Sequence, residues 1–309
     1  MELLNIRVND AEGLVGSDVP FLVYGDTSRG PTVSIIAGVH GCEYVAMRAL
    51  RQFLDELDEN QLEGCLRVVP MANLASFHAR SPFVVPHDAK NLNRCFPGDH
   101  QGTFSDRLAA AIFDGVVRGG DFHIDMHSGD LVEDLIPFCI YDESPVEDTA
   151  RAMARAYGFE YVVRVERGAS PIAGTSSAAA AEISIPSITA EAGGRGLVDE
   201  HSVRRHLEGL RRTLSMLGLL SGPAAPAVEA KEVNSWTWLR APIAGWWECD
   251  VEVGTIVSRG TEVGRVRSLE ANVSEVVLAP VTGVPLFVTT SPAVAEQGLL
   301  LGFGALEVQ

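Results

Sequence analysis

"TVSIIAGVHGCEYVAMRALRQFLDELDEN" (residues 32–60) joins a β-branched, apolar run to an amphipathic one through a short turn. The run 32–40 predicts a buried strand, because uninterrupted β-branched sequence is typical of parallel strands that are covered on both faces. Apolar residues then recur at helical spacing over 43–60, which predicts a helix. His40 and Glu43 flank the turn, where open α/β sheets commonly hold their ligands.

The same alternation of strand-like and helix-like segments continues along the chain. Further strands are expected at 65–73, 121–129, 161–165 and 187–194, and further helices at 104–117, 146–158 and 199–220. Strands that alternate with helices predict an α/β domain with a largely parallel sheet. Residues that follow different parallel strands can meet at one edge of such a sheet.

The character of the chain changes after a Pro/Ala linker, "SGPAAPAVEA" (221–230). The segments that follow are short and β-like, with Gly and Pro turns between them and no helical periodicity. The sequence therefore predicts two domains, a large α/β domain over residues 1–228 and a small all-β domain over residues 229–309.

The two halves of the predicted β domain repeat each other. "LRAPIAGWW" (239–247) and "VLAPVTGVP" (277–285) share an apolar pair, then Ala-Pro, then Gly. This repeat resembles the barrel-sandwich fold of biotinyl and lipoyl carrier domains, which attach their cofactor to a hairpin lysine. The matching turn here, "RSLEANVS" (267–274), contains no lysine, and Lys231 precedes the fold. We therefore expect a domain that shapes the site and carries no covalent cofactor.

Composition and charge exclude several classes of protein. The chain has 309 residues and a formal net charge of −17, which argues against nucleic acid and anionic membranes as partners, because phosphate binding needs basic patches. No stretch reaches the ~20 apolar residues of a membrane span. The first ten residues, "MELLNIRVND", do not read as a secretory signal, and the five scattered cysteines contain no Cys-x-x-Cys pair. We therefore expect a reduced, cytoplasmic protein.

His40 and Glu43 are candidate metal ligands, although the pair alone is equally typical of an ordinary strand-to-helix turn. Imidazole nitrogen and carboxylate oxygen are common zinc donors, and a catalytic zinc needs a third protein ligand. His127, in "HIDMHSGD" (123–130), ends a predicted strand and is the candidate. Asp125, on the same face, could instead support that histidine, and His123 is a competing ligand deeper in the strand.

Two further segments carry candidate substrate-binding and catalytic groups. "NLNR" (91–94) places Arg94 beside amides, and a guanidinium fork can hold a carboxylate, although a surface arginine next to an Asx turn would look the same. "SITAEAGGRG" (187–196) delivers Glu191 at a strand end followed by two glycines. A carboxylate there could act as general base, or be an exposed strand-end residue. Glu182 is the alternative base.

Taken in order, "GVHGCE", "NLNRCFPG", "DMHSG" and "TAEAGG" resemble the succinylglutamate desuccinylase/aspartoacylase family, which is related to zinc carboxypeptidases. The resemblance covers nearly the whole chain, including the β domain. It implies a zinc-carboxypeptidase-like mixed sheet flanked by helices, with a small C-terminal all-β barrel-sandwich-like domain. It also implies one Zn²⁺ per chain, bound by His40, Glu43 and His127.

The same resemblance assigns roles to other residues. Glu191 would act as general base and acid, and Asn93 and Arg94 would hold the substrate carboxylate. Arg80 would polarise the scissile carbonyl, although the spacer between it and "NLNR" is longer than usual in the family. Cys42 stands where the family commonly has Asn or Gly, so we expect its thiol to face away from the metal.

The activity that follows from the resemblance is that of a zinc-dependent amidohydrolase, or deacylase. Its substrate would be a small N-acyl amino acid or a related compound, and the protein would form a homo-oligomer. One alternative is a metallocarboxypeptidase that cleaves peptide C-termini with the same groups. Another is a catalytically silent binding protein of the same fold, which would be favoured if a ligand or the base were missing.

Overall fold

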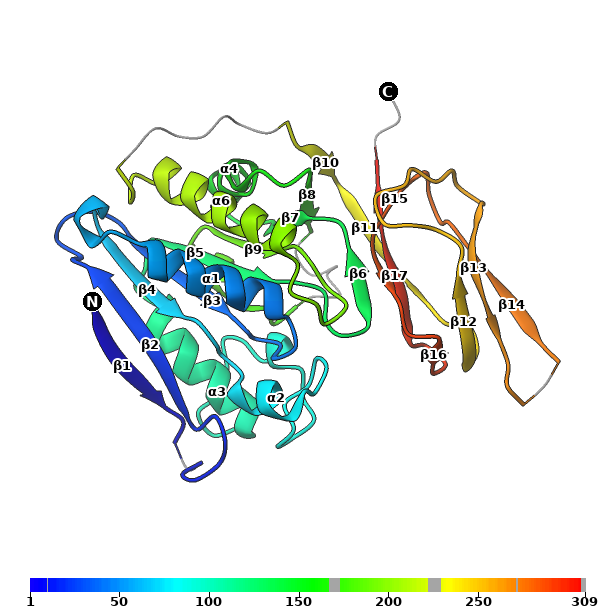
Figure 1. Ribbon diagram of the computed structural model, residues 1–309, viewed down its shortest axis with the longest axis horizontal. Coiled ribbons are helices and arrows are strands. Elements are labelled where there is room, and N and C mark those ends of the chain that lie inside the picture. The colour runs from blue at the N-terminus through cyan, green and yellow to red at the C-terminus, as the bar shows by residue number, and fades with distance from the viewer. Residues whose placement is uncertain (10, 167–172, 222–228, 271, 307–309) are drawn as a thin grey trace.

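The computed structural model describes residues 1–9, 11–166, 173–221, 229–270 and 272–306, and its largest element is a mixed sheet. The strands of this sheet are β1 (Glu2–Arg7), β2 (Asp18–Gly25), β3 (Thr32–Ala37), β4 (Cys65–Val69), β5 (Phe122–His127), β7 (Phe138–Asp142), β8 (Tyr161–Val165), β9 (Ser187–Glu191) and β10 (Lys231–Val233). Their order is β1-β2-β4-β3-β5-β9-β7-β8-β10 (Figure 1). The neighbours β4, β3, β5 and β9 are parallel, so their carboxyl ends share one edge.

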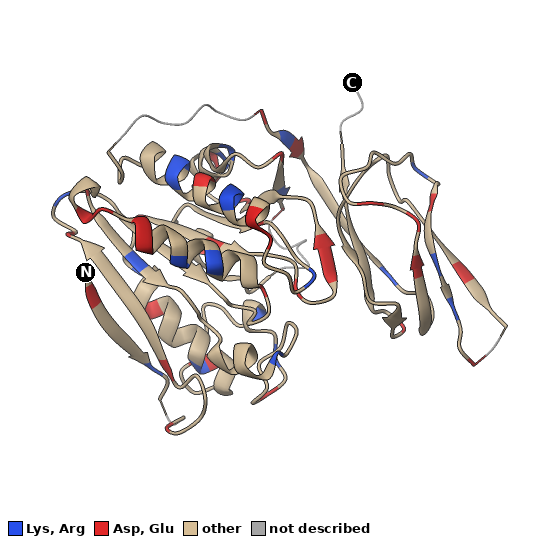
Figure 2. Cartoon of the chain, viewed as in Figure 1, with Lys and Arg blue, Asp and Glu red and all other residues tan. Residues whose placement is uncertain are grey.

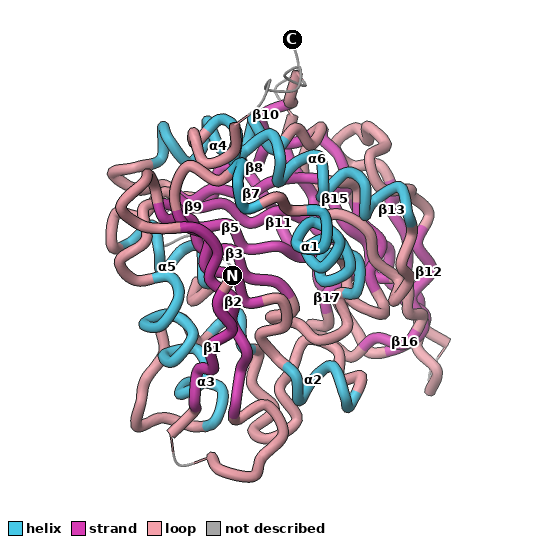
Figure 3. Tube along the Cα trace, turned by 60° about the vertical axis from the view of Figure 1, so that its left-hand side comes forward, coloured by secondary structure: helices cyan, strands magenta, loops and turns pink. Residues whose placement is uncertain are grey.

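Helices cover both faces of this sheet. On one face lie α1 (Tyr44–Glu56), α4 (Glu147–Tyr157) and α6 (Glu200–Met216), and on the other lie α3 (Phe104–Ile112) and α5 (Ser176–Glu182) (Figure 3). Successive side chains along each strand point to opposite faces of the sheet, so each strand contributes to the hydrophobic core on either face. Val33 and Ile35 of β3 pack against the first group of helices, whereas Ile36 packs against the second.

Shorter helices connect these elements. They are α2 (Leu74–Ala79), the 3₁₀ helices η1 (Glu59–Gln61) and η2 (Leu92–Arg94), and the π-helix η3 (Phe113–Val117). η3 directly continues α3, so the helix predicted over 104–117 forms as two pieces with different hydrogen bonding.

Two four-stranded sheets form the C-terminal part of the molecule, at the right of Figure 1. One contains β11 (Ser235–Arg240), β17 (Leu299–Ala305), β15 (Gly283–Thr289) and β6 (Glu133–Leu135), in that order. The other contains β14 (Ser274–Leu278), β13 (Glu262–Arg267), β12 (Gly245–Cys249) and β16 (Ala293–Val294). β6 comes from the N-terminal half of the chain, and β10 joins the large sheet. The division at residue 228 stays a prediction.

The predicted α/β class, with a mixed sheet flanked by helices, is confirmed. Each predicted strand and helix of the large domain is found, although several end earlier than predicted. For example, the helix predicted over 199–220 is α6, which ends at Met216. Sequence reasoning missed several elements, among them the β1–β2 hairpin, β7 and α5. The hairpin lacks a clean alternation of buried and exposed residues, and "SSAAAAE" has no apolar periodicity.

Charged residues lie mainly on outward surfaces. Both α1 and α6 carry basic and acidic side chains (Figure 2). Arg51 pairs with Asp55 within α1, and Arg211 of α6 pairs with Glu56. All five cysteines are free, as expected. Within the described ranges, no helix has the length and apolar character that a membrane span requires.

Gly209 on α6 gives a test of the helix packing over this sheet. A Cβ at Gly209 would lie 2.2 Å from Cε1 of Tyr157, whose ring is fully buried. The Tyr157 hydroxyl donates to His206 Nδ1 at 2.8 Å. Gly209→Ala should therefore destabilise the fold by about 1–3 kcal/mol through overpacking, despite the better helix propensity of alanine. Thermal unfolding should show a Tm lower by several degrees.

Gly115 provides the matched control. A Cβ there would meet Ile6 Cγ1 at 3.5 Å, which is ordinary contact. Gly115→Ala should leave Tm unchanged or slightly raised. Equal Tm values for the two variants would contradict the tight α4–α6 contact.

Candidate active site

The candidate residues gather at the carboxyl edge of three neighbouring parallel strands. His40 follows β3, His127 ends β5 and Glu191 ends β9. His127 and Glu191 are directly opposite each other in the β5–β9 register. Glu43 is the N-cap residue of α1, and its backbone N–H donates to His40 O at 3.3 Å, which closes the turn. The topology therefore brings together residues that are far apart in the sequence.

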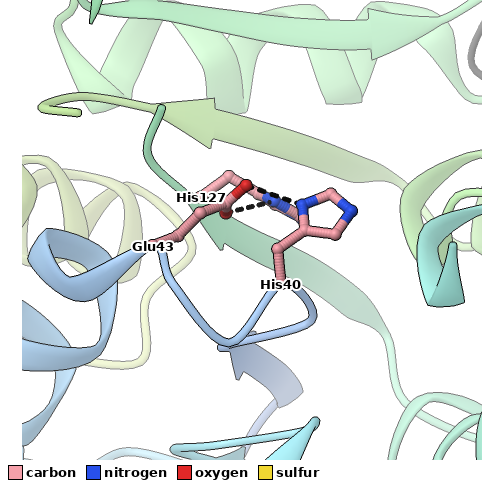
Figure 4. Close-up of side chains that lie close together, drawn as sticks. All are labelled: His40, Glu43 and His127. Atoms are coloured by element: carbon pink, nitrogen blue, oxygen red, sulfur yellow. Dashed lines mark hydrogen bonds and ion pairs between the residues drawn. The ribbon is translucent and has the colours of Figure 1, made fainter. Parts of the chain in front are cut away.

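His40, Glu43 and His127 form one buried cluster (Figure 4). His40 Nδ1 lies 2.6 Å from Glu43 Oε1, and His127 Nδ1 lies 2.8 Å from Glu43 Oε2. One donor atom from each residue can be chosen so that all three lie within 4.8 Å of one another. The three predicted ligands are thus close enough to hold one metal ion.

The far side of each imidazole contacts an oxygen. His40 Nε2 lies 2.9 Å from Asn91 Oδ1, and His127 Nε2 lies 3.1 Å from Asp125 Oδ1. An Nε2–H of His40 that donates to Asn91 leaves the lone pair on Nδ1, which faces Glu43. His127 Nε2 is in ion-pair contact with Asp125, and its Nδ1 also faces Glu43. This arrangement is typical of metal-binding histidines, so the donor set fits a divalent metal ion.

The electrostatics of the cluster favour positive charge. Burial raises the pKa of Glu43, but His40 and His127 outweigh that effect and lower it to about 2. Burial likewise lowers the pKa of each histidine, but Glu43 raises that of His40, and Asp125 with Glu43 raises that of His127 well above its usual value. The buried carboxylate therefore stays ionised and stabilises a cation between the two rings.

A row of hydrogen-bonded polar side chains extends from Asp125, the partner of His127, into the sheet. Ser176 Oγ donates to Asp125 Oδ2 at 2.5 Å and lies 2.9 Å from His123 Nε2. His123 Nδ1 lies 2.9 Å from Ser34 Oγ, and burial lowers the pKa of His123 to about 4. His123 is therefore neutral within this hydrogen-bonded row and lies outside the metal-binding group. Asp125 contacts His127 directly.

The segment "NLNR" forms η2 beside the cluster. Asn91 Oδ1 caps this helix by accepting from the N–H of Asn93 at 2.8 Å, and Asn93 Nδ2 lies 3.3 Å from His127 Nε2. Arg94 donates to Asn93 O at 2.6 Å. Its guanidinium lies 6.0 Å from the ring centroid of Trp238, and it forms no ion pair with any described residue. An unpaired guanidinium beside the cluster can bind an anionic group.

The cluster, Arg94 and Glu191 all open into one cavity of about 500 Å³. Glu191 is partly buried, and burial raises the pKa of its carboxyl well above the usual value, with further increases from Glu43 and Glu133. A carboxyl group with a raised pKa is suited to exchange protons near neutral pH. The cavity can therefore bring an anion anchor, a metal site and a proton acceptor to one small molecule.

Sequence reasoning missed several side chains that line this cavity. Glu133 is the first residue of β6, and burial and Glu43 raise its pKa to about 7. Phe83 packs edge-on against His40 with ring centroids 5.9 Å apart. Trp236 and Trp238 come from β11, where their spacing of two residues places them on one face, the only local signal available.

Other predicted positions lie outside the cavity. Arg80 caps α2 in the left-handed conformation, with φ at 51°, is exposed, and is absent from the side chains that line the cavity in the described structure. Its role at the carbonyl stays a prediction. Cys42 is buried and belongs to neither the metal-binding group nor the described cavity lining, as expected. Glu182 ends α5, is exposed, and also lies outside this cavity.

Several known proteins are similar to this chain in fold and sequence. The chain is 27% identical over 271 residues to the N-alpha-acetyl-L-2,4-diaminobutyric acid deacetylase of Halomonas elongata, which covers 85% of this chain and 78% of the relative. The crystal structure of a succinylglutamate desuccinylase from Silicibacter sp. TM1040 is 25% identical, with a TM-score of 0.83 over 94% of this chain and 89% of that chain. The product-bound ectoine utilization protein EutE (DoeB) of Ruegeria pomeroyi has the same fold, with 23% identity and a TM-score of 0.85 over 98% and 95%.

A family model decides the assignment. The model of the succinylglutamate desuccinylase/aspartoacylase catalytic domain matches residues 29–217. That range is more than half of the chain and includes every residue of the cluster, η2 and Glu191. The resemblance seen in the sequence is therefore confirmed, and the chain belongs to the succinylglutamate desuccinylase/aspartoacylase family.

Proposed function

We propose that this protein is a zinc-dependent amidohydrolase that cleaves the amide bond of an N-acyl amino acid or a related compound. The observation that carries the proposal is the opening of the His40–Glu43–His127 cluster into the same cavity as Arg94 and Glu191. Membership of the family supports it, and so does the deacetylase activity named for the Halomonas elongata relative.

Substrate binding depends on Arg94. Its guanidinium has no carboxylate partner among the described ion pairs, and it faces the cavity together with Asn93. A bidentate interaction with the substrate carboxylate would fix the position of the adjacent amide. Holding the substrate in this way lowers the barrier by orientation alone.

The hydrolytic step needs a base that later serves as an acid. Zinc held by His40, Glu43 and His127 would supply Lewis acidity, lowering the pKa of water toward 7 and polarising the amide carbonyl. Glu191 accepts the proton of the attacking water and returns it to the leaving nitrogen. Asp125 and Asn91 hold the imidazole rings in the required orientation.

We further propose that residues 229–309 form a barrel-sandwich-like domain that restricts substrate size. Trp236, Trp238, Phe287 and Leu299 from this part of the chain line the cavity. A wall at this position limits how far a peptide chain could extend beyond the scissile amide, which argues against the carboxypeptidase alternative. The presence of the three ligand side chains and Glu191 argues against a silent binding protein.

The first prediction concerns the metal. The wild-type protein should bind one zinc ion per chain, and His127→Ala should lose both the metal and amidohydrolase activity, because two protein ligands remain where a catalytic site needs three. Metal content per chain, measured by mass spectrometry on folded protein, checks this. His78→Ala is the control, since His78 is exposed on α2. Full zinc occupancy in His127→Ala would rule out the assignment.

The second prediction concerns the carboxylate anchor. Arg94→Lys keeps the charge but loses the guanidinium fork, so kcat/KM should fall by more than tenfold, about 1.4 kcal/mol. Steady-state kinetics on a carboxylate-bearing N-acyl amino acid measures this. Arg48→Lys, at an exposed position on α1, is the control. Unchanged kinetics in Arg94→Lys would count against the anchor, and Arg80→Lys in parallel tests the role predicted for Arg80.

The third prediction separates the base from the ligands. Glu191→Gln preserves the shape of the side chain but cannot accept a proton, so kcat should fall by at least ~10²-fold while zinc stays bound. Metal content and turnover are measured on the same sample. Glu182→Gln should retain turnover, because Glu182 lies outside the cavity. Loss of zinc from Glu191→Gln would identify Glu191 as a ligand. If Glu191→Gln kept its turnover and Glu182→Gln lost it, Glu182 would be the base.

A further inference from the structure

One wall of the cavity is rich in aromatic side chains. The cavity volume of about 500 Å³ lies within the range of pockets that enclose drug-sized ligands. The metal-binding cluster, Arg94 and Glu191 occupy only part of its lining. The lining from the C-terminal part of the chain includes Trp236, Trp238, Phe287 and Leu299, next to Phe138 of β7.

The aromatic side chains of this wall pack against one another. The ring centroid of Trp236 lies 6.0 Å from that of Phe138, 5.6 Å from that of Trp238 and 6.0 Å from that of Phe287, always edge to face. Trp238 and Phe287 are 5.9 Å apart. Edge-to-face packing stabilises such a cluster, so the wall is formed before any ligand binds.

A glycine in β17, the strand between β11 and β15, allows these aromatic side chains to pack together. Gly302 of β17 is paired with Trp238 of β11 on one side and with Phe287 of β15 on the other. A Cβ at Gly302 would lie 2.1 Å from Phe287 Cε1 and 2.6 Å from Trp236 Nε1. The rings therefore lie directly over the backbone of β17, and their position is set by the sheet.

The charges beside this wall are positive. The guanidinium groups of Arg94 and Arg240 lie 6.0 Å and 5.8 Å from the ring centroid of Trp238. They occupy the positions from which a cationic substrate side chain would contact that ring. Three carboxyl side chains, Glu43, Glu133 and Glu191, also line the cavity, and Glu133 is the one that the proposed mechanism does not use.

We propose, on the basis of the function proposed above, that the substrate carries a bulky apolar group, aromatic or extended aliphatic, that packs on Trp236, Trp238 and Phe287. Arg94 holds its carboxylate, and the apolar group displaces water from the aromatic wall. The group belongs either to the acyl chain or to the amino-acid side chain, since both flank the scissile amide. A small polar or cationic side chain would leave this wall without a partner.

Two substrate series test the proposal and identify which side of the amide carries the group. The first compares N-acetyl-L-alanine with N-acetyl-L-leucine, N-acetyl-L-phenylalanine and N-acetyl-L-2,4-diaminobutyrate. The second compares N-acetyl-L-alanine with N-hexanoyl-L-alanine and N-phenylacetyl-L-alanine. In one series kcat/KM should rise at least tenfold for the bulky apolar members, as expected for added methylene groups in an apolar pocket.

Variants link this preference to the wall. Trp238→Ala should reduce the ratio of kcat/KM for the bulky substrate to that for N-acetyl-L-alanine by at least tenfold, and Trp238→Phe should restore much of it. Trp246→Ala is the matched control, because Trp246 is an exposed tryptophan of β12 outside the cavity lining. Its ratio should equal that of the wild type.

A binding measurement is independent of turnover. Glu191→Gln protein, studied by calorimetry, should bind the preferred bulky compound at least tenfold more tightly than N-acetyl-L-alanine. The inference would be overturned if the alanine or diaminobutyrate compounds were bound and hydrolysed as well as the bulky compounds or better. It would also be overturned if the kcat/KM ratio of the bulky substrate to N-acetyl-L-alanine were unchanged in Trp238→Ala. Either result would leave the proposed function intact. Failure to hydrolyse any member of either series would overturn the proposed function itself.

Discussion

Parallel pairing of β3, β5 and β9 determines which residues can meet in this protein. The register places His127 opposite Glu191, and the end of β3 brings His40 to the same edge. A shift of one residue in β5 would turn His127 and Asp125 toward the opposite face and bring Met126 to the site. The apolar residues of β5 on the other face, Ile124 and Met126, are packed in the core and therefore resist such a shift.

The buried carboxylate of Glu43 imposes a second constraint. Burying a charge is costly unless it is paired and hydrogen-bonded. Glu43 contacts both histidines and accepts from the N–H of Ser128 at 3.2 Å. The histidines in turn contact Asn91 and Asp125, and the polar chain from Asp125 continues to Ser176. The site is therefore supported from several strands and loops, not by its turn alone.

The residues of the metal-binding cluster could be predicted from the sequence, whereas the aromatic residues of the cavity could not. His40, Glu43 and His127 could be named as candidate ligands from their strand-end positions and residue types, and the resemblance to the family singled them out from Asp125 and His123. Trp238 and Phe287 could not be assigned to the cavity, because they reach it through pairing of distant segments. β6 pairs with β15 although well over a hundred residues separate them, and no local periodicity encodes such a contact.

The position of β17 has a consequence for synthesis of the protein. β17 lies between β11 and β15, and Leu299 at its start lines the cavity. Glu191 is the last of the metal-binding and catalytic residues to be translated, and it precedes Leu299 by roughly a hundred residues, which corresponds to about 5–20 s on the ribosome. During that interval a nascent chain would carry its reactive groups without the aromatic wall. Selectivity is therefore acquired last, when β17 inserts between its two neighbours.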